Sequence, residues 1–317
     1  MEFNSSYTTD EKRRMDNPFS GVATFMKAPY LDNIEELTKE NCDIAVLGMP
    51  YDMGASLRSG QRFGPRGIRN ASMWNAYCFK GWYSPIDDET FMDEDWKVVD
   101  VGDIDVIHTE HSLSFENLTD AVRRISSKGI IPFVMGGDHA ITTPALRGMD
   151  SYEDLCVIHF DAHLDFTMSA GGVFEGHGSP MRRASEMEHI GQIVQIGMRG
   201  VGSSKKSDWD DARANGNIIM DIRKVRENGI QWVLDSIPKK EHYYITFDID
   251  CLDQTLVPGC GSPTPWGMMY EEILPIFKNI ASKGKIVGAD FVEVCPPYDI
   301  NEQTALYTAQ LMLDLMG

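Results

Sequence analysis

Short apolar runs, each long enough for one buried strand, recur along the 317-residue chain and constrain its fold most strongly. A strand buried on both faces of a sheet is apolar throughout, whereas a half-exposed strand alternates. These runs therefore predict a mainly parallel sheet that is covered on both faces. The runs occupy residues 43–48, 97–103, 130–138, 155–163, 192–197, 243–250 and 285–294.

Segments of helical length lie between the runs. Residues 114–128 carry apolar side chains three or four positions apart and stop before Gly129. Residues 269–283 repeat this spacing, although Pro275 predicts a kink or a break near their start. Residues 301–316 predict a C-terminal helix. The alternation of strands and helices indicates an α/β fold in which a mainly parallel sheet lies between two layers of helices.

No internal repeat, low-complexity linker or sharp change of composition divides the chain, so we expect one domain over residues 1–317. Residues 1–30 and 84–95 are polar and are expected to be surface arms or loops. Either segment could instead make subunit contacts.

Charge and composition exclude several classes of partner. The 29 basic against 48 acidic residues give a formal charge of −19, which repels nucleic acid and anionic membrane surfaces. The polar N-terminus and the lack of an apolar run near ~20 residues predict a cytoplasmic chain that does not span a membrane. The six cysteines form no CxxC pair, so a disulfide framework is not expected.

Polar side chains cluster where the predicted strands end, which is where open parallel sheets bind ligands. The first such run ends in two glycines, Asp138 and His139, and the glycines permit close backbone approach. In the next, Asp161, His163 and Asp165 alternate and would share one face if the strand persisted. Carboxylate mixed with imidazole suits divalent transition metals. A solvated strand face could show the same alternation, but unpaired carboxylates in an apolar central strand would be costly.

A third strand end carries Asp248 and Asp250, again two positions apart, followed by Asp253. Two carboxylates on one face repel each other unless a cation lies between them. Each aspartate could instead cap a helix or a turn. The agreement of three strand ends favours a metal centre, and four aspartates with two neutral imidazoles would balance two divalent ions.

These strand ends, in their order and separation, resemble the signatures of the ureohydrolase family, which includes arginase, agmatinase and guanidinobutyrase. The resemblance extends from about residue 43 to the C-terminus and is closer to agmatinase over 291–299 (FVEVCPPYD). It implies the three-layer α/β fold of that family. The motifs that carry it are Gly136–His139, Asp161–Asp165, Asp248–Asp253, and residues 58–69 (RSGQRFGPRGIR).

The resemblance implies two divalent metal ions, usually manganese, with nickel in some members. Asp161 and Asp248 would bridge the two ions. His159 lies deeper in the strand and is expected to hydrogen-bond rather than to bind metal. By similarity, one ion would be held by His139, Asp161, Asp165 and Asp248, and the other by Asp161, His163, Asp248 and Asp250.

The resemblance also implies a mechanism in which hydroxide between the metals attacks the guanidinium carbon. Asp165 would pass the proton to the leaving amine, releasing urea and an amine or ammonia. Glu293 would hold the guanidinium, because paired carboxylate oxygens match its N–H donors. His177, between two glycines, would move protons or orient substrate. From the residues alone, Glu293 could be an ion-pair partner and His177 an exposed loop residue.

The loop 258–267 departs from the agmatinase pattern. Thr264 stands where a glutamate is usual, and Trp266 where a glycine is usual. Before the loop, Gln254 stands where a proline usually follows the last aspartate motif. If the loop borders the pocket, the indole fills volume that a long substrate would need. We therefore expect guanidine or a small substituted guanidine as substrate, with agmatine or a guanidino acid as the alternative. Trp266 could also face away and pack against a neighbouring element or subunit.

Assembly is a further expectation. Members of the family form homo-oligomers, and the resemblance implies a trimer or a hexamer. A different class of function is a noncatalytic accessory subunit in a hetero-oligomer with a relative, although the complete ligand set disfavours it. A single-zinc deacetylase is disfavoured because the paired aspartates predict two metals.

Overall fold

The computed structural model describes residues 18–78, 81–85, 88–91 and 96–317. Its centre is an eight-stranded sheet in the order β4-β1-β5-β10-β9-β6-β7-β8, in which every neighbouring pair is parallel. This confirms the predicted parallel sheet. The strands are β1 (Ile44–Gly48), β4 (Val98–Asp103), β5 (Ile131–Met135), β6 (Leu155–Phe160), β7 (Ile190–Met198), β8 (Ile218–Asp221), β9 (His242–Asp248) and β10 (Lys285–Val292).

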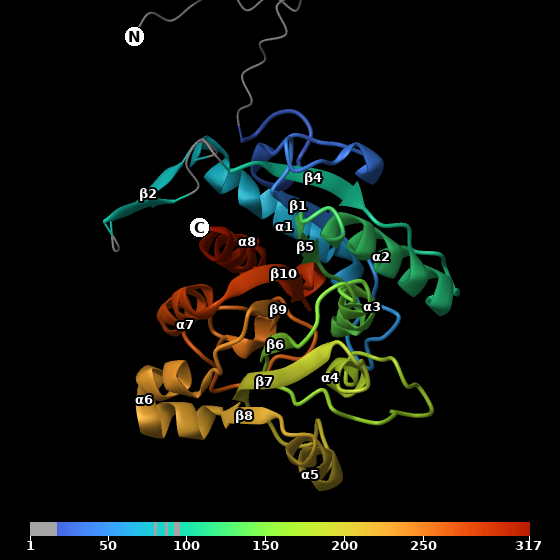
Figure 1. Cartoon of the computed structure of the whole chain (residues 1–317), viewed down its shortest axis with the longest axis vertical. Helices are drawn as coiled ribbons and strands as arrows, with labels where there is room; N and C mark the ends of the chain where they lie inside the picture. The colour runs from blue at the N-terminus through green and yellow to red at the C-terminus, as the bar shows by residue number, and fades with distance from the viewer. Residues whose placement is uncertain (1–17, 79–80, 86–87, 92–95) are drawn as a thin grey trace, which may run out of the picture.

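Helices cover both faces of the sheet, as predicted. Buried residues of α1, α6, α7 and α8 pack in one core cluster, and those of α2, α3, α4 and α5 pack in a second cluster on the other face (Figure 1). The chain is therefore a three-layer α/β domain. The helices are α1 (Gly64–Ser72), α2 (His111–Ser126), α3 (Thr142–Arg147), α4 (Pro180–Ala184), α5 (Lys206–Ala214), α6 (Ile222–Ser236), α7 (Tyr270–Lys283) and α8 (Gln303–Met316).

Of the kink or break predicted at Pro275, the break is wrong, because α7 continues through this residue. Proline removes one hydrogen bond and clashes with the preceding turn. Here it lies in the second turn, and the buried Ile273, Ile276 and Phe277 hold the helix against the sheet. Packing of this apolar face outweighs the local cost.

The expected surface arm over residues 1–30 is corrected in part. Residues 1–17 lie outside the described residues. Further along, Phe25 and Met26 are buried at 0% and 1% exposure, and their backbone N–H groups donate to Asp100 and Ser72. Asp100 and Ser72 satisfy the buried backbone N–H groups of this segment, which allows its apolar side chains to join the core.

The expected loop 84–95 contains part of an antiparallel hairpin, β2 (Trp82–Ser84) and β3 (Glu89–Phe91), while 86–87 and 92–95 are not described. The five cysteines with described side chains are free and buried. Within the described ranges, no helix is both long and apolar enough to cross a membrane.

Candidate metal centre

Four adjacent strands place the candidate residues at one edge of the sheet. In the order β5-β10-β9-β6, the segments just past the strand ends carry His139, Glu293, Asp250 and Asp161, and Asp248 is the last residue of β9. Because all four strands are parallel, their carboxyl ends lie side by side. The sheet thus brings together motifs that are more than a hundred residues apart.

A row of stacked phenylalanines fixes these strand ends in register. Phe160, Phe247 and Phe291 are paired across β6, β9 and β10, and Phe133 of β5 continues the row. Neighbouring ring centroids lie 5.0, 5.7 and 6.4 Å apart. Offset stacking of buried rings adds to the energy of their burial. Asp161 and Asp248 directly follow two of these rings, so the row holds both carboxylates at one level.

His139 forms one half of the centre. Its Nδ1 atom lies 3.1 Å from Oδ2 of Asp161, 3.1 Å from Oδ2 of Asp165 and 3.3 Å from Oδ2 of Asp248. This nitrogen is buried, yet among the described residues it has no hydrogen bond of acceptable geometry. A buried polar atom without a partner is costly, so this position is suited to an additional cation.

The tautomer of His139 follows from its other nitrogen. Nε2 lies 3.0 Å from Oγ1 of Thr246, and that hydroxyl donates its only proton to Oδ1 of Asp290 at 2.7 Å. The oxygen of Thr246 must therefore accept a hydrogen bond from the N–H at Nε2. A neutral imidazole then presents its lone pair at Nδ1, as a metal ligand requires.

His163 forms the other half of the centre. Its Nδ1 lies 3.3 Å from Oδ1 of Asp161 and 3.2 Å from Oδ2 of Asp250. Oδ2 of Asp250 is a second buried atom without a hydrogen bond among the described residues. Two groups with the spacing of metal ligands thus share Asp161, which is the arrangement expected of a bridging carboxylate: one comprises His139, His159, Asp161 and Asp165, and the other Asp161, His163 and Asp250.

The electrostatics of the cluster also demand positive charge. Burial raises the pKa of Asp248 and Asp250, and mutual repulsion of the carboxylates raises it further for Asp248. Burial disfavours a charged His139, yet the surrounding carboxylates hold the pKa of this imidazole well above its usual range. Protons or metal ions can supply this charge, and the mixed donor set of imidazole and carboxylate fits divalent transition metals.

The expectation that β6 persists through the motif is wrong, because the strand ends at Phe160. Asp165 adopts a positive φ of 50°, and Oδ1 of Asp161 accepts a hydrogen bond from the backbone N–H of His163 at 2.6 Å. A tight turn, rather than strand alternation, therefore brings the three side chains together. Short aspartate side chains favour such turns by accepting local backbone hydrogen bonds.

His159 hydrogen-bonds to the cluster, and its geometry disfavours metal binding. Its Nδ1 lies 3.1 Å from the amide nitrogen of Gln195, whose oxygen accepts a hydrogen bond from Asn217. Nδ1 is therefore the acceptor, and Nε2 donates to Oδ2 of Asp161 at 2.7 Å. No lone pair is left for an ion, so the role expected for His159 agrees with its contacts.

Glu293 and His177 meet beside His139. Glu293 is buried at a φ of 66°, and its Oε1 accepts from the backbone N–H of His139 and lies 3.2 Å from Nδ1 of His177. Burial opposes charge on both groups, but their mutual attraction prevails. It lowers the pKa of Glu293 and raises the pKa of His177 to about 9.

Sequence reasoning missed several residues that support these groups. Gln61 donates to Oε2 of Glu293 at 2.9 Å, and a Cβ at Gly261 would lie 2.6 Å from the same oxygen. Thr246 and Asp290 could have been found, since each is a lone polar residue in an apolar strand. Gln61 lies in the motif 58–69, but nothing in the sequence indicated its contact with Glu293, which is 232 residues away.

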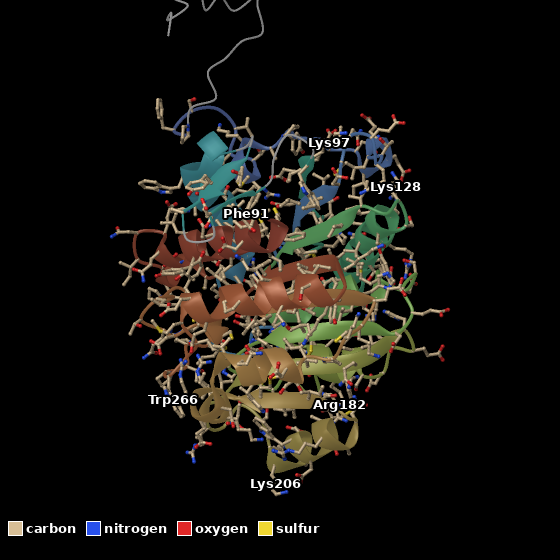
Figure 2. All side chains as sticks on the ribbon, turned by 60° about the vertical axis from the view of Figure 1, so that its left-hand side comes forward. Phe91, Lys97, Lys128, Arg182, Lys206 and Trp266 are labelled. Carbon is tan, nitrogen blue, oxygen red and sulfur yellow. The ribbon has the colours of Figure 1, made fainter. Side chains whose placement is uncertain are left out.

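The loop residues Thr264 and Trp266 occupy different environments. Oγ1 of Thr264 lies 3.2 Å from Nε2 of His163, so this side chain reaches the cluster. Trp266 is 52% exposed at a φ of 67°, and Figure 2 labels it at the margin of the molecule. None of the ring contacts among the described residues involves its indole.

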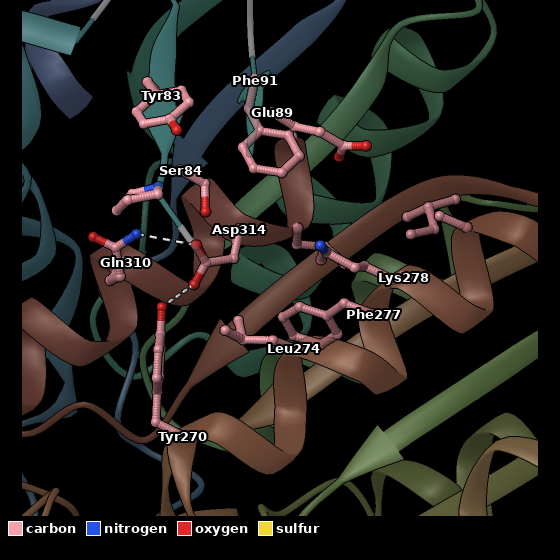
Figure 3. Close-up of a pocket in the computed structure, with 15 residues that line it drawn as sticks. Tyr83, Ser84, Glu89, Phe91, Tyr270, Leu274, Phe277, Lys278, Gln310 and Asp314 are labelled. Carbon is pink, nitrogen blue, oxygen red and sulfur yellow. Dashed lines mark hydrogen bonds between the residues drawn. The ribbon is translucent and has the colours of Figure 1, made fainter. Parts of the chain in front are cut away.

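A separate pocket of about 450 Å³ lies between the β2–β3 hairpin, α7 and α8 (Figure 3). Its walls are mostly apolar, and Asp314 within it accepts hydrogen bonds from Tyr270 and Gln310. It borders Ile286 near the start of β10, whereas Glu293 follows the end of that strand. None of the clustered histidines and aspartates lines this pocket.

Comparison with known proteins gives three consistent findings. The model of the Arginase family matches residues 42–317. The guanidinobutyrase of Pseudomonas aeruginosa is 32% identical over 312 residues, which cover 94% of this chain and 92% of that protein. The agmatinase of Bacillus subtilis is 32% identical over 305 residues, which cover 96% of this chain and 98% of that protein.

A solved structure agrees with these sequence matches. Proclavaminate amidino hydrolase from Streptomyces clavuligerus superposes with a TM-score of 0.82 at 27% identity, covering 94% of this chain and 97% of that one. The two curated relatives carry names that specify different guanidino compounds, although their identity to this chain is the same. Overall similarity therefore does not distinguish between their substrates.

Proposed function

The chain belongs to the arginase family of metal-dependent amidinohydrolases, and from this premise we propose that the centre around His139 and His163 hydrolyses a guanidinium compound. The products are urea and an amine, or ammonia when the substrate is guanidine itself. The observation that carries the proposal is the buried Nδ1 of His139, which faces three carboxylates without a hydrogen bond among the described residues. A nitrogen lone pair that faces three carboxylates is suited to bind a metal ion together with them.

We assign the ligand roles from these contacts and, for Asp248 at the second ion, from the resemblance to the family. His139, Asp165 and the shared Asp161 and Asp248 would hold one ion, while His163 and Asp250 complete the second position with the shared pair. The ions are divalent, manganese by preference and nickel as the alternative. When bound, they lower the pKa of water and make hydroxide available near neutral pH.

Glu293 supplies the guanidinium-binding group. Its carboxylate is ionised at neutral pH, since the pKa is held below its usual range. Oε2 accepts from Gln61, and Oε1 accepts from the backbone N–H of His139 and from Nδ1 of His177, which leaves a lone pair on Oε2 for a planar cation. A carboxylate fixed in this way needs little reorganisation when it accepts an N–H of the substrate.

Asp165 moves a proton and His177 orients the substrate. The oxygen of hydroxide joins the guanidinium carbon, Asp165 accepts the remaining proton of that oxygen, and this proton goes to the nitrogen that leaves as a neutral amine when the C–N bond breaks. Asp165 is suited to this step because it is 6% exposed and lies beside the cluster. His177 spans Glu293 and the hydroxyl of Ser56, 2.9 Å from its Nε2, and orients the substrate from the mouth of the site.

We further propose that the substrate is guanidine or a small substituted guanidine. Thr264 reaches His163, and the proposal places the half-exposed indole of Trp266, two residues further along the loop, over the opening of the pocket, where it would exclude a long substrate. The alternatives are agmatine and guanidino acids, which are named by the relatives at equal identity.

Urea release from the purified chain, loaded separately with manganese and nickel, tests the proposal. The panel comprises guanidine, methylguanidine, guanidinobutyrate, agmatine and arginine. The smallest substrates are expected to give the highest kcat/KM. Preference for a long substrate would overturn the pocket assignment but keep the chemistry, whereas no urea from any compound would favour an accessory, noncatalytic role.

A further inference from the structure

Arg199 is a buried arginine whose hydrogen-bond partners are all main-chain carbonyls. It directly follows β7 and is 8% exposed. No carboxylate among the described residues forms an ion pair with it. Nε donates to Pro265 (3.1 Å), Nη1 donates to Gly197 (3.2 Å) and Cys251 (3.2 Å), and Nη2 donates to Asp250 (2.6 Å), Leu252 (3.2 Å) and Thr264 (2.8 Å).

Of these six carbonyls, that of Gly197 belongs to β7, and the other five belong to two segments that border the metal centre. One is the short 3₁₀ turn Ile249–Cys251 with the residue after it, which carries Asp250. The other is the loop 253–267, which carries Thr264. The ends of such turns leave carbonyls without partners, and burial makes them costly. The planar guanidinium of Arg199 donates to the carbonyls of both segments at once and so fixes one segment against the other.

Both segments hold His163. Thr264 lies 3.2 Å from Nε2 of this imidazole, and Oδ2 of Asp250 lies 3.2 Å from Nδ1. The hydroxyl of Thr264 also points to the carbonyl of Ser262, 3.2 Å away, so its proton has an acceptor and its oxygen can accept Nε2–H. A neutral His163 would then present its lone pair at Nδ1.

The other histidine is held differently. Thr246, the partner of His139, lies in the middle of β9 and is fixed by pairing with β6 and β10 on both sides. Thr264 lies outside the sheet, where no strand pairing of its own fixes it. Its backbone carbonyl is instead bound by Nη2 of Arg199.

We propose that Arg199 is a positioning residue for the second metal site: it clamps Thr264 and Asp250 about His163, so that Nδ1 of His163 and Oδ2 of Asp250 face the same ion. This inference rests on the proposed function only in taking His163 and Asp250 as ligands. Arg199 itself does not touch substrate or metal.

Manganese binding tests the clamp independently of turnover. The full-length chain, stripped of metal and titrated with Mn²⁺, is compared with Arg199→Met, Arg199→Lys, Thr264→Val and Thr264→Ser, by bound ions per chain and by melting temperature. The Arg199 variants and Thr264→Val are expected to keep one tight ion and to bind the second about 10- to 100-fold more weakly. Arg199→Lys is not expected to restore affinity for the second ion, because the three donors of an ammonium group sit on one nitrogen and cannot reach all of these carbonyls. Thr264→Ser retains wild-type binding.

Arg69→Met is the matched control. Arg69 is also 8% exposed, but it forms ion pairs with Asp100 and Asp103 of β4. This is an edge strand, and β1, β5 and β10 lie between it and β9. This variant is expected to melt at a lower temperature and still bind two ions with wild-type affinity. If the Arg199 variants behave like Arg69→Met, Arg199 is structural only and the inference is wrong.

The remaining outcomes separate this inference from the proposed function. Unchanged affinity in Thr264→Val also overturns the clamp, even if the Arg199 variants do not fold. A wild-type chain that binds only one Mn²⁺ overturns it as well, whatever the urea assay gives. Two ions in the wild type, weakened binding in the variants and no urea would support the clamp and refute the hydrolase proposal.

Discussion

The proposed bridging aspartates, Asp161 and Asp248, are the residues on which the metal centre is expected to depend most. Asp161 approaches both His139 and His163, so the loss of its charge weakens the binding of both ions. Asp161→Asn and Asp248→Asn are therefore expected to lose bound metal and to reduce kcat/KM by about 1,000-fold or more. Metal content and urea release measure this. Asp150→Asn, at an exposed ion pair with Arg123, should change neither.

Trp266 connects substrate range with backbone strain at a single residue. Its φ of 67° lies in the left-handed region, which glycine adopts readily and a bulky residue such as tryptophan does not. Trp266→Gly is therefore expected to keep or raise stability, by up to about 1 kcal/mol, while kcat/KM for guanidinobutyrate and agmatine rises. A substrate profile identical to that of the wild type would place the indole outside the pocket.

At this scale the sequence is informative where chemistry recurs at short spacing. Asp161, His163, Asp248 and Asp250 stand out because charged residues two apart are unusual after a buried strand. Arg199 has no such pattern. Its hydrogen-bond partners are main-chain carbonyls that only folding brings next to it, so the sequence does not indicate its role. The contact of Thr264 with His163 likewise joins segments a hundred residues apart.

Among the elements, the phenylalanine row on four strands links stability to the centre. Phe247 is fully buried and stacks on Phe160 and Phe291. Phe247→Ala is expected to lower the free energy of unfolding by about 3–5 kcal/mol and to weaken metal binding, because the end of β9 loses its support. Denaturant unfolding and Mn²⁺ titration measure the two effects.

Phe115→Ala is the control for this variant. Phe115 is 2% exposed in α2 and packs on Tyr51 and His111, away from the row. It should lose a similar free energy of unfolding while Mn²⁺ affinity stays as in the wild type. Equal loss of metal binding in both variants would mean that the row has no specific role.

The loop that carries His177 is attached to two helices through Glu175. This carboxylate accepts from His111 of α2 at 3.0 Å and pairs with Arg147 of α3. The hydrogen bond from His111, followed by that from Arg147, lowers the pKa of Glu175 from 4.5 to about 2 despite partial burial. Its ionised form therefore stabilises the fold above pH 4.5, and this contribution is lost as the pH falls toward about 2.

Glu175→Gln is accordingly expected to reduce stability at pH 6 by about 1 kcal/mol after solvent screening, and to flatten the decline between pH 4.5 and pH 2. Unfolding free energies measured across this range test the attachment. Parallel curves for the wild type and the variant would contradict it.

Element boundaries were less predictable than the elements. The run 155–163 predicted a longer strand, but β6 ends at Phe160, because Asp161 begins a tight turn in which its Oδ1 accepts the backbone N–H of His163. The edge strand β8 was missed because it has only four residues, most of them half-buried. Helices α3 and α4 are too short for helical periodicity to show.

For the whole molecule, the alternation of apolar runs and helices was enough to predict the three layers. It could not show that residues near Phe25 complete the core, because that packing depends on distant Asp100 and Ser72. The assembly stays a prediction. Exposed apolar side chains such as Leu57 and Phe19, each 86% exposed, favour burial between subunits.

Light scattering on the purified chain is expected to give the mass of a trimer or a hexamer of 35.6 kDa subunits. Leu57→Ser should shift the distribution toward smaller species, because it removes apolar area from a contact. A wild-type chain that is monomeric at micromolar concentration would contradict the predicted assembly.

The central claim is that two metal ions at this centre enable the chain to hydrolyse guanidinium. The most direct measurement is urea release during titration of the metal-free chain with Mn²⁺, with bound ions counted at each step. The account predicts that turnover of at least one guanidino compound rises with metal and levels off at two ions per chain. Urea release that is independent of metal, or no urea from any compound once two ions are bound, would contradict it.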